Sequence, residues 1–356
     1  MERRTITLIR GDGIGPEVTG AAALVLKSVG VDFDWEICDA GMMALGKYGT
    51  PLPNETLESI QENQVALKGP LDTPIGAGYD SINVRLRKEF KLYANIRPIK
   101  SMPGVKSHYE NVDLVVFREG IEGVYGGTEK YLRRHVRRDD EIVGAEIKGA
   151  ISTANCHKFF EKVFKYAKEH GRKRVTIIHK ANIFKKTGGL FLETGQHIGR
   201  IYADIIETDD MIVDNTAQKL VLDPTRFDVL ACNNEHGDIL SDLCAGLVGG
   251  LGLAPGANIG DQIAIFEAVH GTAPDIAGKG IANPAAVILS AAMMLDHIGE
   301  AKAANIIRWA VAAVINNGIR VTRDLNPQNG VSTKEMTDAI IEKIQFLHDH
   351  AAEQCC

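Results

Sequence analysis

Short runs of β-branched and apolar residues alternate with longer amphipathic stretches along most of this chain. The short runs predict strands at residues 5–10, 65–68, 112–117, 175–179, 211–213 and 229–232. The longer stretches predict helices at residues 16–29, 54–63, 156–170, 187–204, 284–298, 300–317 and 333–350. Strands that alternate with helices indicate an α/β fold around a largely buried sheet.

Chain length and composition indicate a soluble protein of two domains. The 356 residues exceed the usual domain size of about 100–150 residues. Hydrophobic residues make up 45% of the chain, which fits an ordinary globular protein. The net charge is −6 and no basic tract suggests a nucleic-acid partner. No apolar run approaches the roughly 20 residues needed to cross a membrane.

The cysteines indicate a reducing compartment. The six cysteines are scattered, and none has the spacing of a zinc site or of a disulfide framework. We therefore expect reduced thiols and a cytoplasmic location, or the mitochondrial matrix if a transit peptide was removed.

Residues 120–155 break the alternation of strands and helices. Gly123, Gly126 and Gly127 come first, a charged stretch follows, and apolar and polar residues then alternate over 142–151. This pattern predicts an antiparallel arm over about residues 120–155, and we expect it to pair with another subunit.

The glycines near the N-terminus do not form a dinucleotide-binding fingerprint. Residues 11–16 read Gly-Asp-Gly-Ile-Gly-Pro, with glycine at every second position and then proline. The fingerprint G-x-G-x-x-G, directly after a strand and opening a helix, is not matched. The sequence therefore does not support an ordinary Rossmann fold.

Asp238 and Asp242 form the first candidate site. They lie four residues apart, so on a helix they share one face. Two carboxylates repel each other there, and a hard divalent cation such as Mg²⁺ or Mn²⁺ would turn the repulsion into attraction. The simpler alternative is that both acids interact with the positive end of the helix dipole. The segment alone leaves both interpretations open.

Further polar segments follow one another in a distinctive order. They are residues 81–87 (SINVRLR), 92–98 (LYANIRP), 118–119 (RE), 123–125 (GVY), 179–182 (HKAN), 211–215 (MIVDN), 233–242 (NNEHGDILSD) and 267–278 (EAVHGTAPDIAG). Each is weak evidence alone. Together they resemble the β-decarboxylating dehydrogenases, the family of isocitrate and 3-isopropylmalate dehydrogenases. The resemblance runs from Gly11 to about Gly330 and is greatest to NAD-dependent isocitrate dehydrogenase.

The resemblance implies a two-domain α/β fold without an ordinary Rossmann domain. Residues 1–98 and 256–356 would form a large cofactor-binding domain. Residues 99–255 would form a small domain with the dimer interface and the arm. The active site would lie between the domains and be completed by a second subunit, so the implied partner is another copy in a homodimer or larger homo-oligomer.

The resemblance also assigns roles to individual residues. Substrate contacts are implied for Thr73, Ser81, Asn83, Arg87, Arg97, Arg118 and Asn182. Cofactor contacts are implied for Glu267, His270, Gly271, Thr272, Ala273, Asp275, Ile276 and Asn283. Metal ligands are implied at Asp238, Asp242 and Asp214, the last from across a dimer interface. Tyr125 and Lys180 are implied as catalytic residues.

Ser81 and Asn83 favour isocitrate among the family's substrates. These substrates share a malate core and differ in one side group, which the loop before Arg87 contacts. Isopropylmalate enzymes have apolar residues there, whereas a hydroxyl and an amide suit a third carboxylate. An apolar group would leave both side chains unpaired, at about 1–3 kcal/mol for each buried polar group. Homoisocitrate, or a related substituted malate, stays an alternative because one methylene discriminates by only about 1–3 kcal/mol.

The charges of the implied site fit a trianionic substrate. The cations of Arg87, Arg97, Arg118 and Lys180 face the three metal-site aspartates. A divalent metal ion and a triply charged anion would bring the total charge to zero. Such near balance is required because unpaired buried charge is very unfavourable in a closed, low-dielectric site.

The implied reaction is oxidation at C2 with NAD, loss of CO₂ from the resulting β-keto acid, and protonation of C3. Lys180 or an aspartate would accept the hydroxyl proton, and Tyr125 with help from Lys180 would protonate C3. Bound Mg²⁺ or Mn²⁺ would lower the pKa of the hydroxyl. Asp275 and Ile276 imply NAD, because a carboxylate accepts hydrogen bonds from ribose hydroxyls and repels a 2′-phosphate. Members of the family that use NADP have lysine and tyrosine there.

Two pairs of residues depart from the family pattern. Gly120 and Ile121 stand where asparagine and then serine or threonine are usual. Glu235 and His236 stand where a hydrophobic residue and a variable one are usual.

A third alternative is a non-catalytic regulatory subunit, which would be expected to lose catalytic groups. The sequence disfavours it because every implied catalytic and metal-binding residue is present.

Overall fold

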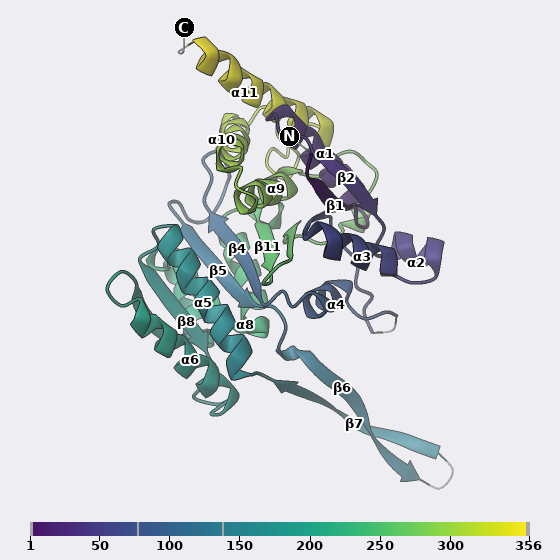
Figure 1. The fold of residues 1–356 in the computed structure, drawn as a ribbon, viewed down its shortest axis with the longest axis vertical. Coiled ribbons are helices and arrows are strands. Elements are labelled where there is room, and N and C mark those ends of the chain that lie inside the picture. The colour runs from purple at the N-terminus through teal and green to yellow at the C-terminus, as the bar shows by residue number, and fades with distance from the viewer. Residues whose placement is uncertain (1–2, 77, 137–138, 354–356) are drawn as a thin grey trace.

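A ten-stranded mixed sheet runs through the molecule and organises the fold (Figure 1). The computed structural model describes residues 3–76, 78–136 and 139–353. The strand order is β2-β1-β3-β12-β11-β4-β5-β10-β8-β9. Their bounds are β1 Thr5–Ile9, β2 Asp34–Cys38, β3 Val65–Lys68, β4 Ala94–Lys100, β5 Asp113–Glu119, β8 Arg174–His179, β9 Glu207–Ile212, β10 Val229–Cys232, β11 Pro255–Ile259 and β12 Ala264–Ala268. The predicted α/β fold is confirmed.

The sheet is parallel at both ends and antiparallel at its centre. β11 pairs antiparallel with β12 and with β4, and β4 pairs antiparallel with β5. The strands outside this centre pair in parallel. Because β4, β11 and β12 are neighbours, residues from distant parts of the sequence meet at the centre of the sheet.

Helices between the strands complete the α/β architecture. Their bounds are α1 Gly15–Ser28, α2 Met42–Tyr48, α3 Asn54–Asn63, α4 Ile82–Glu89, α5 Thr153–Glu169, α6 Thr187–Ile201, α7 Val213–Leu222, α8 Asn234–Leu247, α9 Ala285–His297, α10 Ala301–Asn317 and α11 Thr333–Glu353. Each predicted helix is present, with ends within a few residues of the prediction. The pair Asp238 and Asp242 lies on α8, so the helical geometry assumed for it is confirmed.

Two local predictions were wrong. The segment before Arg87 was expected to be a loop, but α4 begins directly after Ser81, whose hydroxyl caps the helix by accepting a hydrogen bond from the Val84 N–H at 3.4 Å. Val213 was assigned to a strand, but it is the first residue of α7. The loop was implied by the resemblance and not by periodicity. The strand was inferred from the apolar run at residues 211–213, whose last residue begins α7.

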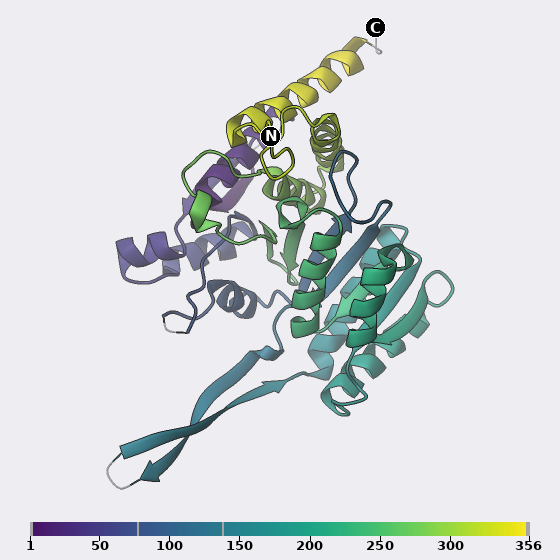
Figure 2. The same ribbon diagram turned by 180° about the vertical axis from the view of Figure 1, so that it is seen from behind.

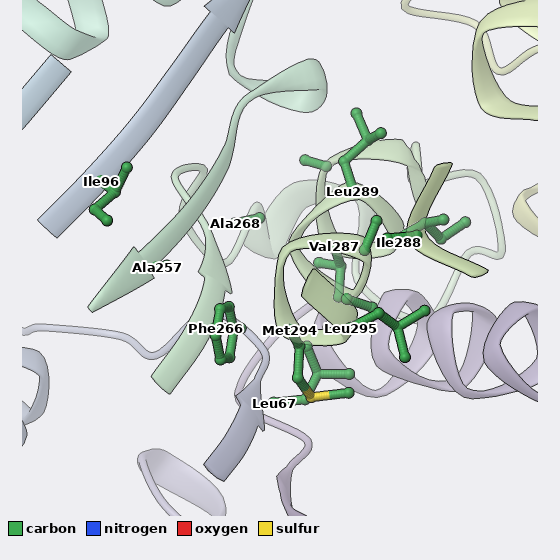
Figure 3. Close-up of a cluster of buried hydrophobic side chains, with 14 of the residues drawn as sticks. Leu67, Ile96, Ala257, Phe266, Ala268, Val287, Ile288, Leu289, Met294 and Leu295 are labelled. Carbon is green, nitrogen blue, oxygen red and sulfur yellow. The ribbon is translucent and has the colours of Figure 1, made fainter. Parts of the chain in front are cut away.

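Helix α9 lies over the centre of the sheet and explains the alternation of its strands. Figure 3 shows its buried side chains, among them Val287 and Met294, packed toward Phe266 of β12. Burial of such side chains contributes about 1.5–3 kcal/mol each. Alternate strand residues point to opposite faces, so the residues next to Ile96 and Ala257 face away from α9.

The predicted arm is an antiparallel pair, β6 Gly123–Val136 and β7 Asp139–Ala150. Figures 1 and 2 show it projecting from the body, at the end of the molecule opposite to α11. Its exposed apolar residues include Tyr131, Leu132, Ile142, Val143 and Ile147. A lone two-stranded hairpin is marginally stable in water, so this apolar surface favours the prediction that the arm packs on another subunit.

The sheet is continuous across the proposed domain boundaries. The boundary at residues 98/99 falls inside β4, and the boundary at 255/256 falls at the start of β11. The largest cluster of buried side chains joins Ile6 and Phe266 of the proposed large domain to Phe160 of the proposed small domain. The division into two domains therefore stays a prediction.

Two further properties concern the whole chain. Among the residues that the structure describes, no helix is both long and apolar enough to cross a bilayer. Cys38, Cys156, Cys232 and Cys244 are free thiols, as expected, while Cys355 and Cys356 lie outside the described residues.

Candidate active site

A polar cavity of about 350 Å³ lies where α4 meets the central strands. It brings together residues that are far apart in sequence. The predicted site residues that line it are Ser81, Asn83, Arg87, Arg97, Arg118, Tyr125, Asp238, Glu267, His270 and Gly271. At least one residue from each predicted group (substrate, catalytic, metal and cofactor) thus lines this cavity.

Three arginines give the cavity its positive charge. Arg87 lies in the last turn of α4, Arg97 lies on β4, and Arg118 lies on β5, where it is only 2% exposed. Burial and the neighbouring charge of Arg87 lower the pKa of Arg118 to about 9. Burial likewise lowers the pKa of Arg87, which is opposed by Glu267. Crowded, desolvated cations of this kind favour the binding of an anion with several carboxylates.

Ser81 and Asn83 lie on the α4 side of the cavity. Ser81 occupies the N-cap, and its hydroxyl accepts a hydrogen bond from Thr73 at 3.4 Å. The Asn83 amide oxygen is buried without a hydrogen-bond partner among the described residues. Buried polar atoms normally have partners, so Asn83 fits a polar ligand and disfavours an apolar one. Thr73 itself is exposed and does not line the cavity.

Helix α8 presents its two aspartates to the arginines. Asn233 caps the helix by accepting a hydrogen bond from the His236 N–H at 2.8 Å. Arg97 then reaches both acids, with Nη1 at 3.1 Å from Asp242 and Nη2 at 3.7 Å from Asp238. Arg118 also forms an ion pair with Asp238.

The donor set of the two aspartates fits a hard divalent cation. Partial burial and the charge of Asp238 raise the pKa of Asp242, and Arg97 opposes this increase. A divalent cation would relieve the repulsion between the carboxylates and supply the ion that carboxylate oxygens favour. Over residues 3–76, 78–136 and 139–353 of one chain, no three His, Cys, Asp or Glu side chains cluster to hold a metal.

Asp214 therefore does not join Asp238 and Asp242 within one chain. It lies in the first turn of α7, is 70% exposed, and accepts a hydrogen bond from Lys180 Nζ at 2.7 Å. This bond lowers the pKa of Asp214 and keeps the carboxylate ionised. Lys180, Asp214 and Asn182 do not line the polar cavity, and Asn182 is exposed in the turn after β8.

Tyr125 reaches the cavity from the base of the arm. Its ring lies 5.5 Å from the Arg118 guanidinium carbon, and the residue is 40% exposed. Burial, and then the charge of Asp238, raise the pKa of Tyr125 above its usual value. The phenol is therefore protonated at neutral pH and can donate a proton into the cavity.

The predicted cofactor residues extend from the cavity toward the N-terminal glycine loop. The Ile14 N–H donates to the Thr272 carbonyl at 3.0 Å, and a side chain at Gly13 would collide with that same carbonyl. Ala273 has a φ of +42°, an uncommon conformation for alanine. Beyond it, Asp275 is exposed and Ile276 is half-buried.

Two atoms of this segment test whether a polar cofactor fits. His270 Nε2 is buried without a partner among the described residues, while Nδ1 contacts the Gly271 carbonyl. Burial lowers the pKa of His270, so the ring is neutral at pH 7. Its Nε2 atom is available to form one hydrogen bond with a ligand. Asn283 is held by Asp324 at 2.8 Å. The residues present fit a nucleotide with ribose hydroxyls.

The sequence analysis assigned no role to three buried polar residues in and beneath the cavity lining. Lys68 is only 1% exposed and forms an ion pair with Glu267 at 2.5 Å. Asn95 and Asn258 are also buried and hydrogen-bond to each other. A signal was available at Lys68, because a charged residue that ends a wholly apolar strand must find a partner.

The structure explains some of the residues that depart from the family pattern. A side chain at Gly120 would collide with the Leu92 carbonyl, so glycine lets β4 and β5 approach here. His236 is buried and lines a second, mostly apolar cavity of about 120 Å³ with Lys180. Burial, His179 and Lys180 lower the pKa of His236 to about 4, so its ring is neutral. Nothing in the structure explains Glu235, which is exposed.

Comparison with known proteins supports the resemblance. The isocitrate/isopropylmalate dehydrogenase family description matches residues 5–340. A mitochondrial regulatory subunit of NAD isocitrate dehydrogenase from Dictyostelium discoideum is 46% identical, over 95% of this chain and 91% of that protein. A mitochondrial catalytic subunit of NAD isocitrate dehydrogenase from Arabidopsis thaliana is 45% identical, over 96% and 88%.

A solved structure shows that the likeness extends to the fold. The crystal structure of isocitrate dehydrogenase from Methylococcus capsulatus is 50% identical and superposes with a TM-score of 0.92. The match covers 96% of this chain and 99% of that one. The fold, the family match and the gathered polar residues agree, and the chain belongs to the isocitrate/isopropylmalate dehydrogenase family.

Proposed function

We propose that this chain catalyses the NAD-dependent oxidative decarboxylation of isocitrate to 2-oxoglutarate and CO₂, with Mg²⁺ or Mn²⁺. The observation that carries the proposal is the set of three arginines around a polar cavity whose α4 wall holds Ser81 and Asn83. Three cations match three carboxylates, and the two polar side chains match the carboxylate that distinguishes isocitrate from an alkyl-substituted malate.

The residues of the chain would act in sequence on the bound substrate. Arg87, Arg97 and Arg118 orient the substrate through its carboxylates. The cavity shields these three arginines from water. The proton of the C2 hydroxyl passes to a base, which is either Lys180 of the neighbouring copy as the free amine or an aspartate carboxylate. After CO₂ leaves, Tyr125 donates its phenolic proton to C3, and Lys180 restores that proton.

Two groups absent from the chain itself would complete the chemistry. Asp238, Asp242 and a second copy's Asp214 would hold the divalent cation. The cation supplies Lewis-acid stabilisation of negative charge on oxygen. Glu267, His270, Gly271, Thr272, Ala273, Asp275, Ile276 and Asn283 would hold NAD, which supplies the hydride acceptor.

An assay of reduced-cofactor absorbance tests the substrate and the cofactor together. The purified chain is given isocitrate, homoisocitrate or 3-isopropylmalate, each with NAD or NADP and with Mg²⁺ or Mn²⁺. We expect kcat/KM to be highest with isocitrate and NAD. Greater kcat/KM with homoisocitrate would favour the alternative substrate, and no turnover of isocitrate would refute the proposal.

A regulatory role is the second candidate, because the Dictyostelium discoideum relative is named a regulatory subunit. The presence of Tyr125, Lys180, Asp214, Asp238 and Asp242 favours catalysis. Turnover by the chain alone separates the two roles. A chain that binds isocitrate without turning it over would be regulatory.

The assembly and the compartment are part of the same proposal. The uncovered apolar surface of the arm and the separation of Asp214 from Asp238 favour a homodimer or larger homo-oligomer. Sedimentation of the purified chain tests this, and a monomer would refute it. The mitochondrial matrix stands beside the cytoplasm as the proposed compartment because the two relatives above are named mitochondrial. Cell fractionation with an antibody to the chain decides between them.

A further inference from the structure

Five polar side chains cross the centre of the sheet on the face opposite to α9. We call them the polar row: Arg97, Asn95, Asn258, Glu267 and Lys68. They lie on β4, β11, β12 and β3, which are adjacent strands. Asn95 is the register partner of Asn258, and Glu267 is the register partner of Lys68. The residues next to them on the same strands, such as Ile96 and Phe266, belong to the apolar cluster under α9 (Figure 3).

Hydrogen bonds run through the polar row without a gap. Arg97 Nε donates to Asn95 Oδ1 at 2.7 Å, and Asn95 Nδ2 donates to Asn258 Oδ1 at 2.9 Å. Asn258 Nδ2 then donates to Glu267 Oε1 at 2.7 Å. Lys68 Nζ forms an ion pair with Glu267 Oε2 at 2.5 Å and donates to the Gly69 carbonyl at 3.0 Å.

The charged ends allow only one orientation of the two amides. Arg97 can only donate, so it faces the oxygen of Asn95. The ionised Glu267 can only accept, so it faces the NH₂ group of Asn258. Burial favours the neutral acid, but Lys68, Arg87 and Asn258 together lower the pKa of Glu267 and keep it ionised. Reversing one amide would leave two donors or two acceptors in contact.

The amides lie away from water. Asn95 is 3% exposed and Asn258 is 2% exposed. A buried polar group without a partner destabilises the protein by about 1–3 kcal/mol, so neither amide can turn alone. Hydrogen bonds in a row also polarise one another in a low-dielectric interior. A shift of Arg97 is therefore transmitted to Glu267, and a shift of Glu267 is transmitted to Arg97.

The two ends of the polar row lie in different parts of the proposed site. Arg97 faces the substrate and the acids of α8, whereas Glu267 faces His270 and Gly271, where the cofactor is proposed to bind. We propose that Asn95 and Asn258 are positioning residues that couple substrate binding at Arg97 to cofactor binding at Glu267. This inference rests on the proposed function.

The Asn95→Leu/Asn258→Leu double variant removes the link but keeps its ends paired. Leucine has the branching of asparagine without its polar atoms. Arg97 retains Ser241 at 2.6 Å and Asp242, and Glu267 retains Lys68. Asn95→Asp is a second variant, which still accepts from Arg97 but, when ionised, cannot donate to Asn258.

Calorimetric titration measures the coupling directly. Isocitrate is titrated with Mg²⁺ present, with and without saturating NADH, and the ratio of the two dissociation constants is the coupling factor. NADH titrated with and without isocitrate must give the same factor, because coupling is reciprocal. We expect the wild-type factor to differ from one by about fivefold or more. In both variants we expect it to fall within about twofold of one.

A control variant separates coupling from a purely structural role. Asn63 also bridges several groups, with Thr7 Oγ1 at 3.0 Å and Glu36 Oε2 at 2.6 Å, but it lies outside the polar row. Asn63→Leu should lower the unfolding temperature and leave the coupling factor unchanged. If the variants of the polar row behave in the same way, the inference is wrong.

The remaining outcomes also decide the question. A wild-type factor of one, or failure of both variants to fold, would overturn the inference. Absence of wild-type isocitrate turnover would refute the proposed function and this inference with it. Wild-type turnover with an unchanged factor in the variants would refute the inference alone.

Discussion

Tyr125 illustrates how the environment of one residue sets its chemistry. It stands at the base of the arm, beside Arg118, and its raised pKa keeps the phenol protonated at neutral pH. A protonated phenol beside the buried guanidinium of Arg118 is suited to donate a proton. The neighbouring cation also stabilises the phenolate that remains, so the residue can act as an acid without a large pKa mismatch.

Replacement of Tyr125 by phenylalanine tests this role. In Tyr125→Phe we expect kcat to fall by about 100- to 10,000-fold, the usual contribution of general acid catalysis. The KM for isocitrate should change much less, because the arginines that bind the carboxylates remain. Steady-state assays measure both constants. Tyr131→Phe, in the exposed part of the arm, is the matched control, and a near-normal kcat in Tyr125→Phe would exclude the assigned role.

Asp275 is the residue on which we propose that the choice of cofactor depends. It is exposed in a short turn that follows the strained backbone of Ala273. In Asp275→Lys we expect the kcat/KM ratio of NAD to NADP to fall by about tenfold or more, equivalent to about 1.4 kcal/mol of charge interaction. The cause is removal of a carboxylate that would repel the 2′-phosphate. Asp275→Asn removes the charge alone and should give a smaller change, and an unaltered ratio in both variants would show that other residues select the cofactor.

Among single residues, the sequence predicted the arginines that line the cavity better than the buried amides beside them. Arg87, Arg97 and Arg118 stand in recognisable polar segments, and the structure gathers them around one cavity. Asn258 could not be found in the same way. It is one polar residue inside an apolar strand, and its importance depends on the cross-strand register with Asn95, which the sequence does not contain.

Among the elements, α8 carries the greatest constraint, and Gly237 shows why. A Cβ atom at this position would lie 2.6 Å from Arg118 Cβ, so glycine allows α8 to lie directly against β5. This contact fixes the position of Asp238 relative to Arg118, with which it forms an ion pair. The motif of residues 233–242 therefore combines a capped helix start, a close approach and a pair of acids in ten residues.

Two glycines of the same helix give a matched prediction. Gly237→Ala should displace Arg118 and so raise the KM for isocitrate by about tenfold or more, a loss of about 1.4 kcal/mol in binding. Gly246→Ala has open space around its added methyl group. It should leave KM unchanged and stabilise the protein by about 0.5–1 kcal/mol, because alanine favours the helix. Kinetics and chemical denaturation measure the two effects, and equal KM values in both variants would contradict the packing argument.

Three of the elements that the sequence did not predict share a physical cause. β4 and α4 expose polar residues to the cavity, and β11 carries the buried amide of Asn258. Periodicity detects an apolar face against a core, and these elements devote part of that face to charged and amide groups. β4 also contains Pro98 within the sheet, which argues against a central strand by local rules. Helices that face only the core and solvent, such as α5 and α10, were predicted to within a few residues.

For the whole molecule, the separation of two groups of candidate functional residues is the dominant feature. Arg97, Arg118 and Asp238 surround the polar cavity, whereas Lys180 and Asp214 pair with each other away from it. Asp214 is 70% exposed, so it is available to a neighbouring chain. A second copy related by symmetry would receive the pair from the first and supply its own in return, which makes each active site a joint product of two chains.

This arrangement predicts complementation between two inactive variants. Lys180→Ala and Asp242→Ala should each be inactive alone. A mixed dimer has one site with an intact Lys180 from one chain and an intact Asp242 from the other, while its second site lacks both. If equal amounts are unfolded together and refolded, half of the dimers are mixed, so about a quarter of wild-type activity should return in a symmetric dimer. The two homodimers mixed without refolding are the control and should stay inactive. Sites contained within single chains could not regain activity by mixing. If differently tagged variants co-purify as mixed dimers and the mixture still stays inactive, Lys180 and Asp242 belong to the same chain's site.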